Sequence, residues 1–125
     1  MNDHITKAEL AAQNPATEEE ILTAILDYLQ AAYSDGKWAT VEPRGGFIRG
    51  RPTRKTYKAG VGVPDIVGCL YGRWVGIEVK TKNGLIRESQ ALFRYDIKHA
   101  WGYYEVCRSI EDVDEFLIPI VRMHG

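Results

Sequence analysis

Glu78 and Lys80 are the residues of this chain whose types and spacing most directly suggest chemistry. They lie two positions apart in the segment 74–82, where apolar and polar residues alternate in the manner of a β-strand. Because strand side chains point alternately to opposite faces, Glu78, Lys80 and Gly76 are expected on one surface. The small Gly76 leaves room there for a bulky group. The opposite, apolar face carries Val75, Ile77 and Val79.

Asp65 is the second acid that bears on this surface. It begins another strand-like segment, 65–71, which residues 71–73 connect to the first. So short a connection predicts an antiparallel hairpin, which can bring Asp65 beside Glu78. Two carboxylates at that distance raise one another's pKa unless a cation lies between them, and Mg²⁺ prefers such oxygen ligands. With Lys80 to position water or stabilise charge, these residue types suit metal-assisted phosphodiester hydrolysis.

The first element expected to support this site is a helix over about 17–33. Thr17 and Glu20 match the capping-box pattern, and the acids at 18–20 suit a helix N-terminus. Apolar residues then recur at helical spacing from Ile21 onward.

Four strands and two further helices complete the expected order. The strands are expected at 38–43, 65–71, 74–82 and 103–108, and the helices at about 87–99 and 110–121, the last capped by Ser109 and ended or kinked by Pro119. The order α-β-(loop)-β-β-α-β-α predicts an α/β domain, a mixed β-sheet flanked by helices with a right-handed crossover through the second helix. The chain 1–125 is expected to form this single domain, with 1–16 as a loose N-terminal arm.

The charge of the chain is unevenly distributed, although its net value is only −1. Residues 1–35 hold seven acids and one base, whereas residues 44–58 hold six bases and no acid. One concentrated basic segment predicts a local anionic partner, for which DNA phosphates are the natural candidate. The bland alternative is a solvated hairpin. The six bases are Arg44, Arg49, Arg51, Arg54, Lys55 and Lys58.

The order of these motifs resembles a known family. Pro64-Asp65 followed by Glu78-Val79-Lys80 is similar to the pattern of the PD-(D/E)XK nucleases. The surrounding sequence over about 17–118 resembles the VRR-NUC branch in five features: Glu20-Ile21 in a first helix, the basic loop, Gly62-Val63-Pro64-Asp65-Ile66 with Ile77-Glu78-Val79-Lys80, Gln90 early in the next helix, and Gly102-Tyr103 before a strand.

The resemblance implies a role for each matching residue. Asp65 and Glu78 would bind the metal, with the carbonyl of Val79 assisting, and Lys80 would serve the nucleophilic water. Gln90 would support the site. A glutamate of the first helix would complete the metal or water network, for which Glu20 matches best and Glu19 is the runner-up.

The resemblance also implies a fold and an activity. It predicts a restriction-endonuclease-like domain that cleaves DNA with Mg²⁺ or Mn²⁺. The small stand-alone members resemble Holliday-junction resolvases, so branched or junction DNA and a homodimer are expected.

Each of these residues also has an ordinary structural interpretation. Asp65 is then a turn acid, Glu78 and Lys80 form an exposed salt bridge, Gln90 faces solvent and Glu20 only caps its helix. Two other functions correspond to these interpretations: a nuclease-like module that binds DNA without cutting it, and an interaction protein that uses its acidic N-terminal helix.

Composition places few further limits on function. Hydrophobic residues make up 45% and charged residues 26%, as in ordinary globular proteins. Neither a membrane-spanning stretch nor a signal peptide is evident, so a cytoplasmic protein is expected. Cys69 and Cys107 lie in apolar, strand-like segments and are expected to be buried, reduced thiols.

Overall fold

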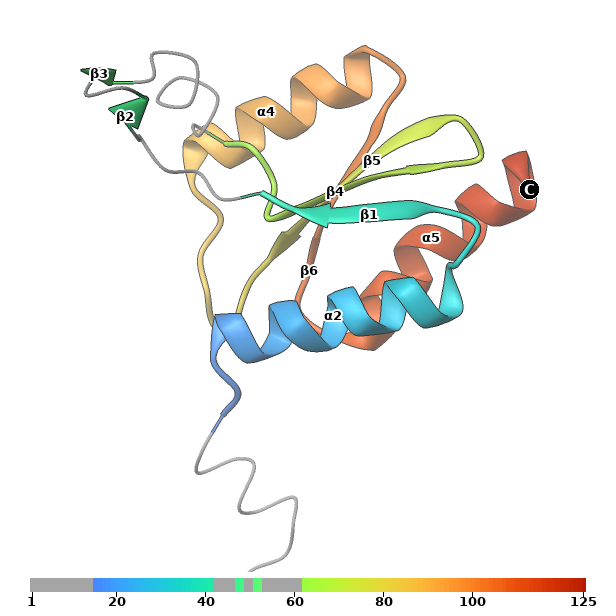
Figure 1. Ribbon diagram of the computed structural model, residues 1–125, viewed down its shortest axis with the longest axis horizontal. Coiled ribbons are helices and arrows are strands. Elements are labelled where there is room, and N and C mark those ends of the chain that lie inside the picture. The colour runs from blue at the N-terminus through green and yellow to red at the C-terminus, as the bar shows by residue number, and fades with distance from the viewer. Residues whose placement is uncertain (1–14, 42–46, 49–50, 53–61) are drawn as a thin grey trace, which may run out of the picture.

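The computed structural model describes residues 15–41, 47–48, 51–52 and 62–125. Within them, a four-stranded mixed sheet has helices on both faces (Figure 1). Its strands, in spatial order, are β1 (Lys37–Thr40), β4 (Ile66–Leu70), β5 (Arg73–Val79) and β6 (Tyr103–Cys107), and the helices are α2 (Glu18–Ala32), α4 (Glu88–His99) and α5 (Ile110–His124). The predicted α/β class and element order are therefore confirmed. The arm expected over 1–16 lies almost wholly outside the described residues.

Strand pairing follows from the lengths of the connections. β1 with β4, and β4 with β5, pair antiparallel, whereas β5 and β6 are parallel and are joined through α4. The β4–β5 turn consists of Tyr71 and Gly72, whose φ angles of 51° and 76° both lie in the left-handed region. Two positive φ angles are typical of the tight hairpin turn whose twist matches that of the strands. The predicted hairpin is thus confirmed.

The basic segment contains a short hairpin. β2 (Phe47–Ile48) and β3 (Arg51–Pro52) pair antiparallel. The segment was predicted to be a loop or a hairpin, and its four described residues form a hairpin. Five of its six bases lie outside the described residues: Arg44, Arg49, Arg54, Lys55 and Lys58.

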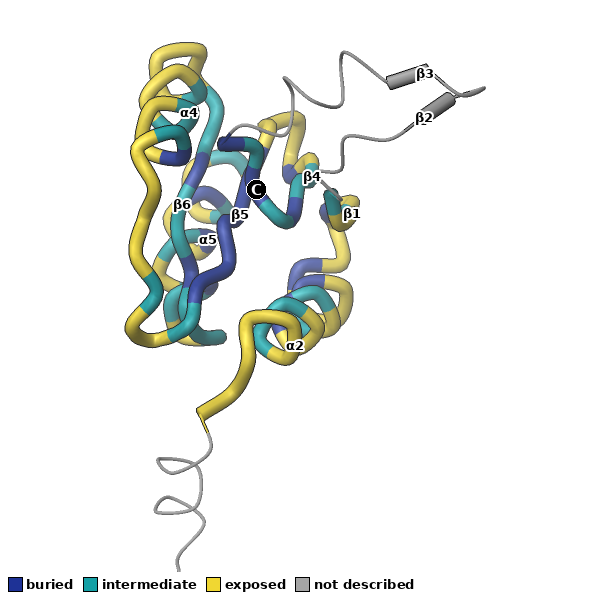
Figure 2. The backbone as a smooth tube through the Cα atoms, turned by 90° about the vertical axis from the view of Figure 1, so that its left-hand side faces the viewer, coloured by how far each residue is buried: buried dark blue, intermediate teal, exposed yellow. Residues whose placement is uncertain are grey.

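The main core lies between the sheet and the helices α2 and α5. In α2, Ile25 and Leu29 are buried, and the capping box of Thr17 and Glu20 starts the helix as predicted. Most sheet residues of this core belong to β4 and β5, and the buried parts of the chain are dark blue in Figure 2. At the C-terminal end of α2, the hydroxyl of Tyr33 donates a 2.6 Å hydrogen bond to Asp114 of α5. This contact joins the two helices at the edge of the core.

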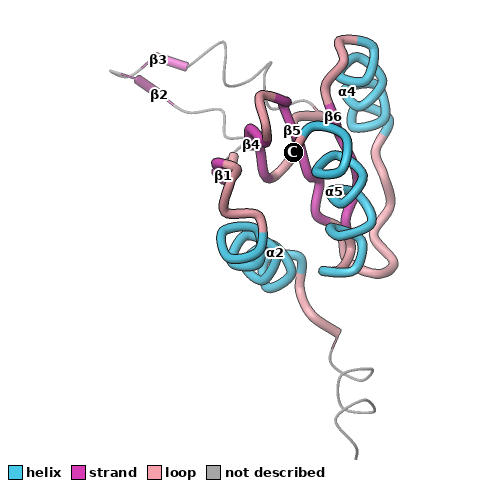
Figure 3. Tube along the Cα trace, turned by 90° about the vertical axis from the view of Figure 1, so that its right-hand side faces the viewer, coloured by secondary structure: helices cyan, strands magenta, loops and turns pink. Residues whose placement is uncertain are grey.

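Among the described elements, α4 covers the opposite face of the sheet (Figure 3). Phe93 of α4 packs between Trp74 and Tyr104, with ring centroids 6.3 and 5.9 Å away. Because α4 lies over β6 rather than β4, Cys69 of β4 is exposed. The prediction of a buried thiol is therefore correct for Cys107 and wrong for Cys69.

Pro119 was predicted either to end or to kink the last helix, and it does not end it. α5 continues through it to His124. A proline inside a helix removes the hydrogen bond from its own position to the carbonyl four residues earlier, which belongs to Glu115. Both residues are exposed, so water can satisfy that carbonyl. None of the helices within the described residues has the length and apolar character needed to span a bilayer.

Candidate metal centre

Asp65 and Glu78 lie opposite one another at one end of the sheet. Ile66 of β4 pairs with Ile77 of β5, so the residues that precede and follow them, Asp65 and Glu78, are cross-strand neighbours. A side-chain oxygen of Asp65 accepts a 2.8 Å hydrogen bond from the backbone N–H of Val79. The structure thus brings together the two acids that the sequence placed on one surface.

Glu18 is the third acid at this place. It begins α2, and one carboxylate oxygen each of Glu18, Asp65 and Glu78 lie within 4.8 Å of one another. Glu18 is exposed, Asp65 is half-buried and Glu78 is only 3% exposed. We call these three residues the acidic cluster. The cluster is exposed to solvent at Glu18, at the start of α2, and buried at Glu78, in β5.

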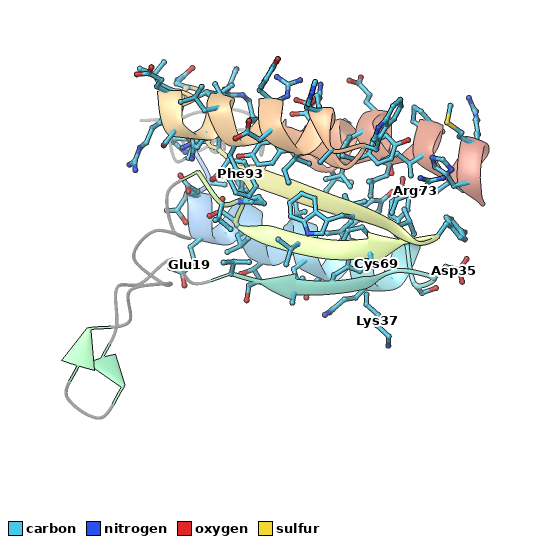
Figure 4. All side chains as sticks on the ribbon, turned by 90° about the horizontal axis from the view of Figure 1, so that it is seen from above. Glu19, Asp35, Lys37, Cys69, Arg73 and Phe93 are labelled. Carbon is cyan, nitrogen blue, oxygen red and sulfur yellow. The ribbon has the colours of Figure 1, made fainter. Side chains whose placement is uncertain are left out.

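The helix acid in this cluster is not the one expected from the sequence. The carboxylate of Glu20 accepts hydrogen bonds of 3.1 and 3.0 Å from the backbone N–H and the hydroxyl of Thr17. Residues two apart on a helix are rotated by about 200°, so Glu18 and Glu20 face different sides. The runner-up Glu19 is also exposed and outside the cluster, at the opposite end of the sheet from Arg73 (Figure 4).

The sequence does contain a signal for Glu18. It lies four, seven and eleven residues before Leu22, Ile25 and Leu29, which pack onto the sheet or are buried in the core. These intervals follow one helical stripe, so Glu18 extends the core-facing side of α2 by one turn. An acid at the end of an apolar stripe is therefore directed towards the edge of the sheet.

Glu78 has the most unusual environment of the three. Within the described residues, its Oε2 atom is buried without a hydrogen-bond partner. Burial, then the neighbouring Asp65, raises the pKa of Glu78 to about 9, and the charge of Lys80 acts in the opposite direction. A buried carboxylate of this kind is costly when charged, and a cation beside it would reverse that cost.

The three carboxylates fit a divalent cation. Mg²⁺ binds oxygen ligands at about 2.1 Å, so two of its ligand oxygens lie at most about 4.2 Å apart. The oxygens of the acidic cluster lie within 4.8 Å of one another, so the site would have to close by less than 1 Å to meet this limit. The unpartnered oxygen of Glu78 offers one such ligand position. The donor set is therefore of the all-oxygen kind that divalent cations such as Mg²⁺ bind, and Glu18 forms its exposed side.

Lys80 follows β5 and is only 7% exposed. Its backbone N–H donates a 3.2 Å hydrogen bond to the carbonyl of Cys107, which extends the β5–β6 pairing by one residue. Lys80 and Glu78 are both buried and form no ion pair with one another in the described structure. They are therefore not the exposed salt bridge of the ordinary interpretation.

Gln90 lies in the first turn of α4 and is only 8% exposed, which contradicts the solvent-facing alternative. Its side-chain oxygen accepts a 2.9 Å hydrogen bond from the backbone N–H of Arg87 and caps its own helix. Gln90 thus fixes the start of α4, and its predicted support of the acids stays a prediction.

Gly76 does not leave the open space that the sequence suggested. A Cβ atom there would lie 2.7 Å from the ring of Pro64 and 2.7 Å from that of Trp74. The space is thus filled by the protein itself. The missing side chain instead lets Pro64 approach β5, which places the adjoining Asp65 beside Glu78.

No family model, no curated protein and no solved structure matches this chain. The resemblance to the VRR-NUC branch therefore stays a hypothesis from the sequence motifs.

Proposed function

We propose that this protein is a metal-dependent DNA endonuclease that hydrolyses phosphodiester bonds with Mg²⁺ or Mn²⁺. The observation that carries the proposal is the buried, unpartnered oxygen of Glu78 in a cluster with two other carboxylates. Buried polar atoms without partners are rare in proteins and are often explained by a ligand or a catalytic role. Lys80 adds a buried cation from the same strand.

In this proposal the acidic cluster binds the metal and Lys80 acts on the reacting groups. Asp65, Glu78 and Glu18 would hold the cation, and the carbonyl of Val79 is a further candidate ligand. When bound, the cation would lower the pKa of a coordinated water and offset phosphate charge. Lys80 donates hydrogen bonds to the attacking water or to a phosphate oxygen, where negative charge develops during hydrolysis.

The basic segment 44–58 is the proposed DNA-binding element. Before it, the backbone N–H of Val41 donates a 2.8 Å hydrogen bond to the carbonyl of Asp65. After it, the carbonyl of Gly62 accepts a 3.3 Å hydrogen bond from the buried hydroxyl of Tyr104. Val41 and Gly62, the described residues on either side of this part of the chain, are thus held near the acidic cluster. Contacts from its six bases to phosphates would bind DNA without regard to sequence and would direct a strand towards the acids.

We further infer that the substrate is branched or Holliday-junction DNA and that the protein acts as a homodimer. This finer inference depends on the resemblance between the sequence motifs and junction-resolving nucleases. A four-way junction presents two equivalent strands, which two copies of the chain would cut symmetrically.

A cleavage assay tests the proposed function. The protein is incubated with a labelled four-way junction, a flap and a linear duplex, each with Mg²⁺, Mn²⁺ or EDTA. We expect junction cleavage with either metal, slower cleavage of linear duplex and none with EDTA. Glu78→Gln removes the charge at nearly equal volume and serves as the inactive control. Binding without cleavage under every condition would instead favour the non-catalytic DNA-binding module.

A further inference from the structure

Arg108 makes an unusual set of contacts directly after β6. Its Nη1 group donates hydrogen bonds to the backbone carbonyls of Thr81, Lys82 and Gly84, at 2.6, 3.3 and 2.8 Å. All three carbonyls belong to the loop that leaves β5 immediately after Lys80. All three bonds come from one nitrogen, whose two N–H groups are shared among the three carbonyls, and the bond to Lys82 is the longest of them.

Gly84 of the same loop also lies close to the side chain of Lys80. A Cβ atom placed on Gly84 would lie 3.4 Å from both Cβ and Cδ of Lys80, which is ordinary van der Waals contact. The loop folds back here through a 3.0 Å hydrogen bond from the N–H of Gly84 to the carbonyl of Thr81. A change in the position of Gly84 would therefore alter the surroundings of the aliphatic part of Lys80.

Arg108 is itself held firmly by the start of α5. Its backbone N–H donates a 2.8 Å hydrogen bond to Asp112, whose own N–H is capped by the hydroxyl of Ser109 at 3.2 Å. In the parallel β5–β6 pairing Val79 is opposite Cys107, so Lys80 and Arg108 leave adjacent strands together. The start of α5 thus provides a rigid support from which Arg108 reaches the loop.

We propose that Arg108 is a positioning residue that fixes Lys80 beside the acidic cluster by holding residues 81–84. Its importance for hydrolysis rests on the function proposed above. Arg108 touches neither the acids nor the reacting atoms in this account. It acts through the loop, and the loop acts through its packing against Lys80. Misplacement of a catalytic group by about 1 Å can cost on the order of a hundredfold in rate.

The first test measures the position of Lys80 without any enzyme assay. Lysines of the folded protein are acetylated under native conditions with acetic anhydride, and the rate at each residue is followed by mass spectrometry. We expect Arg108→Met to accelerate acetylation of Lys80 roughly tenfold, because local opening exposes it. Lys98, which is exposed in the folded chain, should react at an unchanged rate and serves as the internal standard.

Two further variants keep this test interpretable. Arg108→Lys retains the charge and most of the aliphatic stem but lacks the Nη1 group that reaches the loop, so it should give an intermediate rate even if Arg108→Met folds poorly. Arg73→Met removes an exposed charge at the other end of β5 (Figure 4) and should leave Lys80 protected. Unchanged Lys80 acetylation in both Arg108 variants would overturn the inference.

The second test links Arg108 to catalysis. Arg108→Met should lower kcat for junction cleavage at least about tenfold, with little change in KM or in Mn²⁺ affinity. A raised KM with an unchanged kcat would show that Arg108 serves substrate binding and would overturn the positioning role. Faster acetylation of Lys80 in a protein that cleaves no DNA would support the role of Arg108 and would overturn the endonuclease instead.

Discussion

A side-chain oxygen of Asp65 and the backbone N–H of Val79 are joined by a 2.8 Å hydrogen bond. Val79 lies between Glu78 and Lys80, so this bond connects one acid directly to the strand that carries the other acid and the base. It replaces a strand-to-strand backbone contact at the point where β4 has not yet begun. Asp65 therefore has both a structural role and a proposed role as a metal ligand.

The two roles of Asp65 can be separated by two substitutions. Asp65→Asn keeps an oxygen that can accept the bond from Val79 but removes the charge, so we expect normal stability and loss of metal-dependent cleavage by at least about a hundredfold. Asp65→Ala removes both, so it should also lower the free energy of unfolding by about 1–3 kcal/mol. Chemical denaturation and junction cleavage measure the two effects. Full activity of Asp65→Asn would contradict the metal role.

The pH dependence of stability should reflect the environment of Glu78. Its pKa is raised from 4.5 to about 9, chiefly by burial. The unfolded chain releases this proton near the lower value, so the folded chain binds more protons in between. In EDTA, Glu78 should therefore have no effect on the free energy of unfolding below a pH of 4.5, its ordinary pKa. As the pH rises from there towards about 9, the free energy of unfolding should fall, by at most about 1.4 kcal/mol per pH unit.

Glu78→Gln provides the comparison for this pH effect. The variant lacks the titrating group, so its free energy of unfolding should exceed that of the unchanged protein by a margin that grows with pH. Denaturant titrations in EDTA at acid, neutral and alkaline pH measure that margin. A constant margin would show that Glu78 titrates at an ordinary pKa in the folded chain.

Glu18 and Glu20 form a matched pair because they lie in the same helical turn but face different partners. Glu18→Ala should weaken stabilisation by Mn²⁺ in thermal melts and should slow cleavage at least about tenfold. Glu20→Ala should lower stability slightly through loss of the capping box, with metal stabilisation retained. The opposite pattern would show that Glu20, and not Glu18, is the metal ligand on α2.

These two residues also illustrate what the sequence could predict. The capping box of Thr17 and Glu20 is a local pattern, and it correctly located the start of α2. The assignment of Glu20 to the metal depended on a motif register that three consecutive acids blurred. Which of the three acids lies beside the sheet depends on how α2 packs. The apolar stripe that ends at Glu18 is the feature of the local sequence that indicates this packing.

The strand residues were easier to assign because a hairpin leaves little freedom. Once the two residues Tyr71 and Gly72 form the turn, the register places Asp65 opposite Glu78. The burial of Lys80 and the contacts of Arg108 were not predictable in this way. They depend on the relative positions of β5, β6 and α5, which are distant in sequence.

The basic segment should determine how DNA binding responds to salt. Neutralising Arg49, Arg51, Arg54 and Lys55 together should weaken junction binding and reduce the slope of log affinity against log salt by about 3–4, if each contacts a phosphate. The matched control neutralises four exposed bases elsewhere: Lys37, Arg73, Lys98 and Arg122. Binding measured over a range of salt concentrations compares the two sets. Equal slopes would show that general charge, not this segment, attracts the DNA.

The most direct test of the acidic cluster is a titration with Mn²⁺ followed by electron paramagnetic resonance, in the absence of DNA and at about pH 8, because Glu78 loses its proton more readily on binding metal as the pH approaches its raised pKa. The account predicts one site in the unchanged protein, no such site in Asp65→Asn or Glu78→Gln, weaker binding in Glu18→Ala and normal binding in Glu20→Ala. Mn²⁺ binding of unchanged affinity in Glu78→Gln would contradict it.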